Sequence, residues 1–162
     1  MAKNPDPTLT LVTSKGVSRS LDDWTTMFHL CLVVLAPTPA ASAWIPVAQR
    51  IFATFRDADC HCAFVIPADR QVAERLLGHL ESEILTFVDP NLELVNSLGL
   101  ERLPAFVHLR QDAAVVASAE GWNAQEWQQV AREVGAAMAW TVPEVAAPED
   151  PRPTAGVLVS AL

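Results

Sequence analysis

Hydrophobic positions along this chain form two kinds of pattern, short unbroken runs and stripes at helical spacing. Residues 30–35 read Leu-Cys-Leu-Val-Val-Leu, which is typical of a strand covered on both faces. Further strands are predicted over 62–66 and 84–88. A helical stripe follows a proline-rich break at 36–40, and Pro46 inside that stripe predicts a kink. The first half of the chain therefore predicts alternating strands and helices.

Polar capping residues mark where the helices begin. Ser20 precedes one amphipathic stripe and Asp69 precedes another, and both side chains can accept hydrogen bonds from a first helical turn. Asn123 starts the last helix, where Trp122 and Trp127 stand at the two positions of a hydrophobic staple. These signals predict three helix starts from local chemistry alone.

The second half of the chain adds a hairpin to this alternation. A short helix is predicted near 92–98, ended by Gly99. Residues 105–109 and 113–117 predict two antiparallel strands joined by a short turn. The order of elements predicts an α/β fold with a central mixed sheet flanked by helices.

Charge, apolar run length and cysteine number limit the classes of partner and the location that we expect for this chain. The 162 residues carry 11 Lys+Arg and 19 Asp+Glu, a formal charge of −8, which repels phosphate backbones, so we expect no nucleic acid partner. The densest apolar run, 30–36, is too short to span a bilayer, so we expect no membrane insertion. The three cysteines are too few and odd in number for a disulfide framework, which favours a cytoplasmic location.

The ends of the chain differ in composition from its middle. We expect a flexible N-terminal arm over 1–7 and one domain over 8–140. Residues 141–162 form a Pro/Ala-rich tail, and its last residues, 155–162, are apolar again. We expect this apolar segment to dock on a partner or to build a homo-oligomer.

Three stretches follow one another along the chain: the strand, loop and proline-containing helix at 30–55, the Gly-x-x-x-x-Pro stretch at 99–104, and Gly121 before the last helix. By their order and spacing the chain resembles the thioredoxin superfamily over residues 8–140. The resemblance implies a three-layer thioredoxin-like fold in which Pro104 forms a cis peptide bond. The extra helix and strand at 69–88 resemble the insertion found in TlpA-type thiol reductases and peroxiredoxins.

The loop that the resemblance assigns to Cys-x-x-Cys reads Thr38-Pro39-Ala40-Ala41. Thiol–disulfide exchange needs a thiolate, which neither a threonine hydroxyl nor an alanine methyl supplies. Loss of a nucleophile typically lowers the rate on the order of a million-fold. The peroxiredoxin pattern would also place its sulfur at Ala41. We therefore expect no catalytic residue, cofactor or metal at this loop. The simpler expectation is that the protein is not an enzyme.

The leading hypothesis is a non-catalytic protein-binding module, acting as a chaperone, adaptor or assembly factor. In the superfamily that the chain resembles, the loop and the cis-proline turn form a groove for an extended polypeptide, which pairs with the backbone before the proline. The partner would be a protein or peptide segment. The expected binding residues are Thr38, Pro39, Ala40, Ala41, Trp44, Leu103, Pro104, Gly121 and Trp122.

The alternative hypothesis is a divergent thiol–disulfide oxidoreductase or redox sensor that uses Cys60 and Cys62. Two residues apart on a strand, these cysteines have Cα atoms about 6.6 to 6.8 Å apart, the outer limit for a disulfide. A bridge between them would be strained and easily reduced. Packing is the simpler interpretation, and zinc is not expected because the Cys60-His61-Cys62 triplet has no second ligand cluster nearby in sequence. Cys31 is expected to be a small buried apolar residue.

Overall fold

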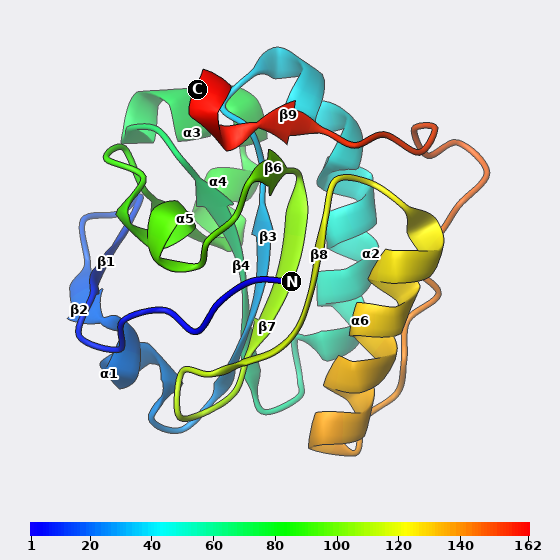
Figure 1. Ribbon diagram of the computed structural model, residues 1–162, viewed down its shortest axis with the longest axis horizontal. Coiled ribbons are helices and arrows are strands. Elements are labelled where there is room, and N and C mark those ends of the chain that lie inside the picture. Colours follow the sequence, from blue (N-terminus) through cyan, green and yellow to red (C-terminus); the bar gives the residue numbers. More distant parts are fainter.

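Seven strands form one central sheet in the computed structural model, which describes residues 1–162. Their order across the sheet is β2-β1-β5-β4-β3-β7-β8, and a second, two-stranded sheet pairs β6 with β9 (Figure 1). The strands of the large sheet are β1 (Thr10–Thr13), β2 (Ser18–Ser20), β3 (His29–Val34), β4 (Cys60–Ile66), β5 (Leu85–Val88), β7 (Ala105–Leu109) and β8 (Val115–Glu120), and those of the small sheet are β6 (Arg102–Leu103) and β9 (Val157–Leu158).

The sheet is mixed, as the order of elements predicts. Strand β3 runs parallel to β4, β4 runs parallel to β5, and the β7–β8 hairpin adds antiparallel strands beside β3. Residues Leu30 to Val34 of β3 are fully buried, because the strand has neighbours on both sides and layers on both faces. Strand β8 begins two residues later than expected, since Ala113 has φ +64 and belongs to the turn.

Helices cover both faces of the sheet. They are α1 (Leu21–Thr25), α2 (Ile45–Phe55), α3 (Arg70–Leu77), α4 (Leu80–Glu83), α5 (Glu93–Ser97) and α6 (Ala124–Met138), with 3-10 helices η1 (Pro39–Trp44) and η2 (Val159–Ala161). Phe64 packs on Phe52 of α2, and Phe87 packs on Trp24 of α1. Because Phe64 pairs with Thr86, Phe64 and Phe87 point to opposite faces, so α1 and α2 form separate layers.

The predicted caps are confirmed. Ser20 accepts from the Asp23 N–H, Asp69 accepts from the Val72 N–H, and Asn123 accepts from the first turn of α6. The staple at α6 also forms, with ring centroids 5.2 Å apart between Trp122 and Trp127.

The predicted kink at Pro46 is wrong. Helix α2 begins at Ile45, so Pro46 occupies the first turn, where its missing N–H costs no hydrogen bond. The 3-10 helix η1 begins inside the proline-rich break, at Pro39, and runs directly into α2.

Both ends of the chain contact the domain. The Ala2 N–H donates to Ser118 Oγ at 2.7 Å, and the Lys3 N–H donates to the Leu98 carbonyl at 2.7 Å. At the other end, Val145 is fully buried and Arg50 of α2 pairs with Asp150. None of the helices has the length and apolar composition of a membrane span.

Candidate functional site

The first candidate site lies at the carboxyl end of β3, where the sequence predicts a binding groove. The Leu103–Pro104 peptide bond is cis, as the resemblance implies. The Pro104 carbonyl accepts the Gly121 N–H at 2.8 Å, so the two predicted turns meet. Thr38 precedes η1, Pro39 and Ala40 are exposed at its start, and Ala41 is buried.

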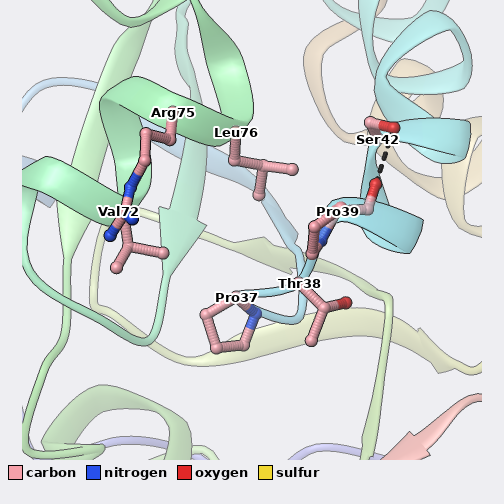
Figure 2. A pocket seen from close by; sticks show the side chains of 7 residues that line it. All are labelled: Pro37, Thr38, Pro39, Ser42, Val72, Arg75 and Leu76. Carbon is pink, nitrogen blue, oxygen red and sulfur yellow. Dashed lines mark hydrogen bonds between the residues drawn. The ribbon is translucent and has the colours of Figure 1, made fainter.

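These predicted binding residues divide between two surroundings. Thr38 and Pro39 line a cavity of about 360 Å³ between the loop and α3, opposite the side chains of Val72, Arg75 and Leu76 (Figure 2). Trp44 does not line that cavity. It is half-buried, and its Nε1 is enclosed without a hydrogen-bond partner.

The other predicted binding residues, Leu103 and Trp122, are covered by the chain's own C-terminal segment. Strand β9 pairs antiparallel with β6, so that Val157 lies opposite Leu103 (Figure 1). The Trp122 N–H donates to the Thr154 carbonyl at 2.8 Å, and the Thr154 N–H donates back at 2.9 Å. The tail that was expected to dock on a partner therefore docks on its own domain, and the backbone edge at Leu103 is occupied.

Two glycines allow this close approach. Gly121 has φ +72, and a Cβ there would lie 2.7 Å from the Ala155 carbonyl oxygen. Gly156 has φ +84, and a Cβ there would overlap the Leu103 carbonyl oxygen. The tail therefore fits against this edge only because each of the two segments has a glycine at the point of closest approach.

The second candidate site is a cluster of three thiols at the amino ends of β3 and β4. The Sγ atoms of Cys31, Cys60 and Cys62 all lie within 4.8 Å of one another, and those of Cys60 and Cys62 are 3.7 Å apart. Cys31 joins the pair because the parallel register places it directly opposite Cys62. Sequence reasoning identified Cys60 and Cys62 but treated Cys31 only as a packing residue. The signal it missed is that Cys31 and Cys62 are each the third residue of their strand, so parallel pairing places them side by side.

Two histidines share the sheet face of the thiols. His29 lies opposite Cys60 and His108 lies opposite Cys31, and residues opposite one another point to the same face. His29 Nδ1 and His108 Nε2 are 2.9 Å apart. His108 is completely buried, and its Nδ1 has no hydrogen-bond partner.

The contacts within the cluster separate the thiols electrostatically. Hydrogen bonds from Cys31 and then Cys62 hold the pKa of Cys60 well below its usual range. The hydrogen bond with Cys31 lowers the pKa of Cys62, but the bond with Cys60 and burial outweigh it and raise that pKa overall. Burial, followed by the proximity of His29, lowers the pKa of His108 to about 4. The cluster therefore favours one thiolate, on Cys60, beside a neutral His108.

The thiol cluster borders an open cavity of about 570 Å³. Cys60 is 7% exposed and Cys62 is half-buried, whereas Cys31 is sealed from solvent. Arg56, which directly follows α2, and Glu83 of α4 line the cavity together with mostly apolar residues. Access to the cluster therefore runs through Cys60 and Cys62.

The two candidate sites lie at opposite ends of the sheet. Five residue steps of β3 and its extension separate Cys31 from Ala36, a span of roughly 16 Å. Thiol chemistry at the cluster therefore cannot use the cis-proline turn or the cavity beside Thr38.

Comparison with known proteins identifies the fold. No protein-family model and no curated protein sequence matches the chain. Among solved structures, the chain is similar to a protein from Chlorobium tepidum described as a putative thiol:disulfide interchange protein DsbE, with a TM-score of 0.68, 17% identity and coverage of 85% of this chain and 97% of that one.

Two structures from Mycobacterium tuberculosis are also similar. One is a secreted disulfide oxidoreductase homologous to E. coli DsbE, with a TM-score of 0.62, 16% identity and coverage of 80% of this chain and 96% of that one. The other is the peroxidoxin BcpB, with a TM-score of 0.58, 14% identity and coverage of 74% and 86%. This chain thus has a thioredoxin-like fold. At these identities the likeness concerns the fold, and the cytoplasmic location stays a prediction.

Proposed function

We propose that this protein is a thioredoxin-fold redox protein in which Cys60 and Cys62 cycle between a dithiol and a disulfide. The observation that carries the proposal is the 3.7 Å separation of their sulfur atoms beside an open cavity. The disulfide oxidoreductases among the similar structures support the same class of chemistry. The reactive sulfurs would stand at the start of β4, away from the loop that contains Thr38.

The exchange follows ordinary thiol chemistry. A thiolate of a dithiol substrate attacks one sulfur of the Cys60–Cys62 disulfide, which forms a mixed disulfide and releases the other cysteine as a thiolate that takes up a proton. The second substrate thiol, as a thiolate, then attacks the substrate sulfur of the mixed disulfide, and the remaining cysteine leaves as a thiolate. Two electrons pass to the protein, and the substrate leaves as a disulfide.

The strand geometry makes the bond labile. The sulfurs must approach from 3.7 Å to about 2.05 Å, while an extended strand holds the two Cα atoms at the outer limit for a bridge. Strained disulfides are the more oxidising ones. We therefore expect the dithiol form to prevail in a reducing compartment and the disulfide to form under oxidation.

Thiol counting tests this function directly. Titrated after unfolding, the reduced protein should show three thiols. Metal-free protein equilibrated in an oxidising glutathione buffer should show one, without a change in monomer mass other than the loss of two hydrogens. Cys60→Ser and Cys62→Ser should each abolish this loss, whereas Cys31→Ala should retain it. Three free thiols after oxidation, or loss of the pair in the Cys60→Ser variant, would contradict the proposal.

A second candidate function is the protein-binding module, acting as a chaperone, adaptor or assembly factor at the cis-proline turn. One observation favours it, namely that the Leu103 edge accepts an extended strand, which here is β9. A partner segment would have to replace the tail. A tail-deleted variant that binds an extended peptide at Leu103, when the full chain does not, would support this function.

A further inference from the structure

We propose that Cys31, Cys60 and Cys62 form a three-thiolate site for a thiophilic metal ion with a filled d shell, Zn²⁺ or Cu⁺. The proposal goes beyond redox cycling and does not rest on it. A disulfide uses two of the sulfurs, whereas the metal site uses all three.

The sulfur positions match what such an ion requires. A metal bound at about 2.3 Å from each sulfur separates the sulfurs by about 4.0 Å in a plane or about 3.8 Å in a tetrahedron. Here the closest pair is 3.7 Å apart and all three lie within 4.8 Å. Small side-chain rotations would bring the third sulfur to the required distance without moving the backbone.

The sheet fixes these positions in advance. Cys31 and Cys62 are opposite residues in the parallel pairing of β3 with β4, in which six consecutive residue pairs are in register. Cys60 lies two residues before Cys62, on the same face. Because two central strands supply the ligands, metal binding would order little additional chain, which favours affinity.

The donor set selects soft ions. Thiolates prefer zinc and monovalent copper, whereas calcium and magnesium take oxygen ligands. No histidine nitrogen or carboxylate oxygen joins the three sulfurs in the group. A three-thiolate set is complete for Cu⁺ and leaves a fourth position for Zn²⁺, which the cavity beside Cys60 and Cys62 can fill with water.

A buried polar atom next to the cluster gives independent support. His108 lies opposite Cys31 and is completely buried, and its Nδ1 has no hydrogen-bond partner. Unsatisfied buried groups are rare and often accompany an ion or water. An imidazole close to a metal–thiolate centre is a typical supporting group for such a site.

Metal titration tests the proposal. Reduced, metal-free protein is titrated anaerobically with Zn²⁺ and, in a separate arm, with Cu⁺, each against a chromophoric chelator. We expect one ion per chain, protection of all three thiols from alkylation, and a fall in affinity of at least about 100-fold in Cys31→Ala, Cys60→Ala and Cys62→Ala. His61→Ala is the matched control, because it changes the same tripeptide on the opposite sheet face and should leave the stoichiometry intact.

Two results would overturn the proposal. One is the absence of stoichiometric binding of either ion, and the other is unchanged affinity in Cys31→Ala. If that variant is unfolded by circular dichroism, the X-ray absorption spectrum of the wild-type complex decides, because fewer than three sulfur ligands would refute the site. Binding of only one of the ions identifies the metal. Since Cys31→Ala is expected to retain the Cys60–Cys62 disulfide, failure of the metal site and failure of the redox function give different results.

Discussion

The docking of the C-terminal segment can be tested by adding one methyl group. In Gly156→Ala, the new Cβ would overlap the Leu103 carbonyl oxygen, and the residue would have to keep φ +84. The left-handed backbone alone costs about 1–2 kcal/mol for alanine. The overlap adds to this cost only while β9 stays paired with β6, so the substitution favours release of the segment.

The stability of the docked segment sets the size of the effect. Three hydrogen bonds outside the β6–β9 ladder hold residues 154–159, two between Trp122 and Thr154 and one from the Val159 N–H to the Glu101 carbonyl. At roughly 1 kcal/mol each, they contribute about 3 kcal/mol. Strain and overlap together are of similar size to this stabilisation. We therefore expect the tail to lose most of its protection against amide hydrogen exchange, which corresponds to an acceleration of exchange of about 100-fold.

Amide hydrogen exchange measured by NMR is the assay. The Trp122 N–H, which donates to the tail, should exchange about 100-fold faster in Gly156→Ala, whereas the Val107 amide in the central sheet should not change. Gly16→Ala is the matched control, because Gly16 also has φ +84 but a Cβ there meets nothing within 4 Å. Unchanged Trp122 exchange in Gly156→Ala, or equal acceleration in Gly16→Ala, would refute the reasoning.

Three further predictions concern stability. A histidine in the unfolded chain takes up its proton near pH 6.5 but His108 only near pH 4, so the unfolded state holds more protons between these values. Stability of the reduced, metal-free protein should fall by about 3 kcal/mol as pH drops through this window, and His108→Phe should remove that dependence in urea unfolding. Arg50→Ala removes the ion pair with Asp150, whose side chain is 7% exposed. The substitution should lower the free energy of unfolding by about 1–2 kcal/mol and speed proteolysis of the tail, and an unchanged cleavage rate would contradict this prediction. Trp127 is fully buried and donates to the Gly121 carbonyl, so Trp127→Ala should lower the free energy of unfolding by about 3–5 kcal/mol, and a loss under 1 kcal/mol would be inconsistent with this packing.

Elements set by neighbouring residues could be predicted from the sequence. The caps at Ser20, Asp69 and Asn123 each bond to a backbone N–H two or three residues away, so the signal and its target lie in one short stretch. The buried run at 30–35 predicts the central strand for the same reason, because burial on both faces requires apolar side chains throughout. Resemblance, rather than periodicity, supplied the cis bond at Pro104.

Contacts between distant segments could be assigned only from the tertiary structure. Cys31 is 29 residues from Cys60 in the numbering of the chain, and their proximity depends on the register of β3 against β4, which no local pattern specifies. The tail lacks any periodic pattern, and its place beside Leu103 depends on two glycines, at 121 and 156, meeting across the fold. Local hydrogen bonds and burial therefore determined the elements from sequence, whereas backbone register and close approach, which are properties of pairs of segments, decided the thiol cluster and the covered groove.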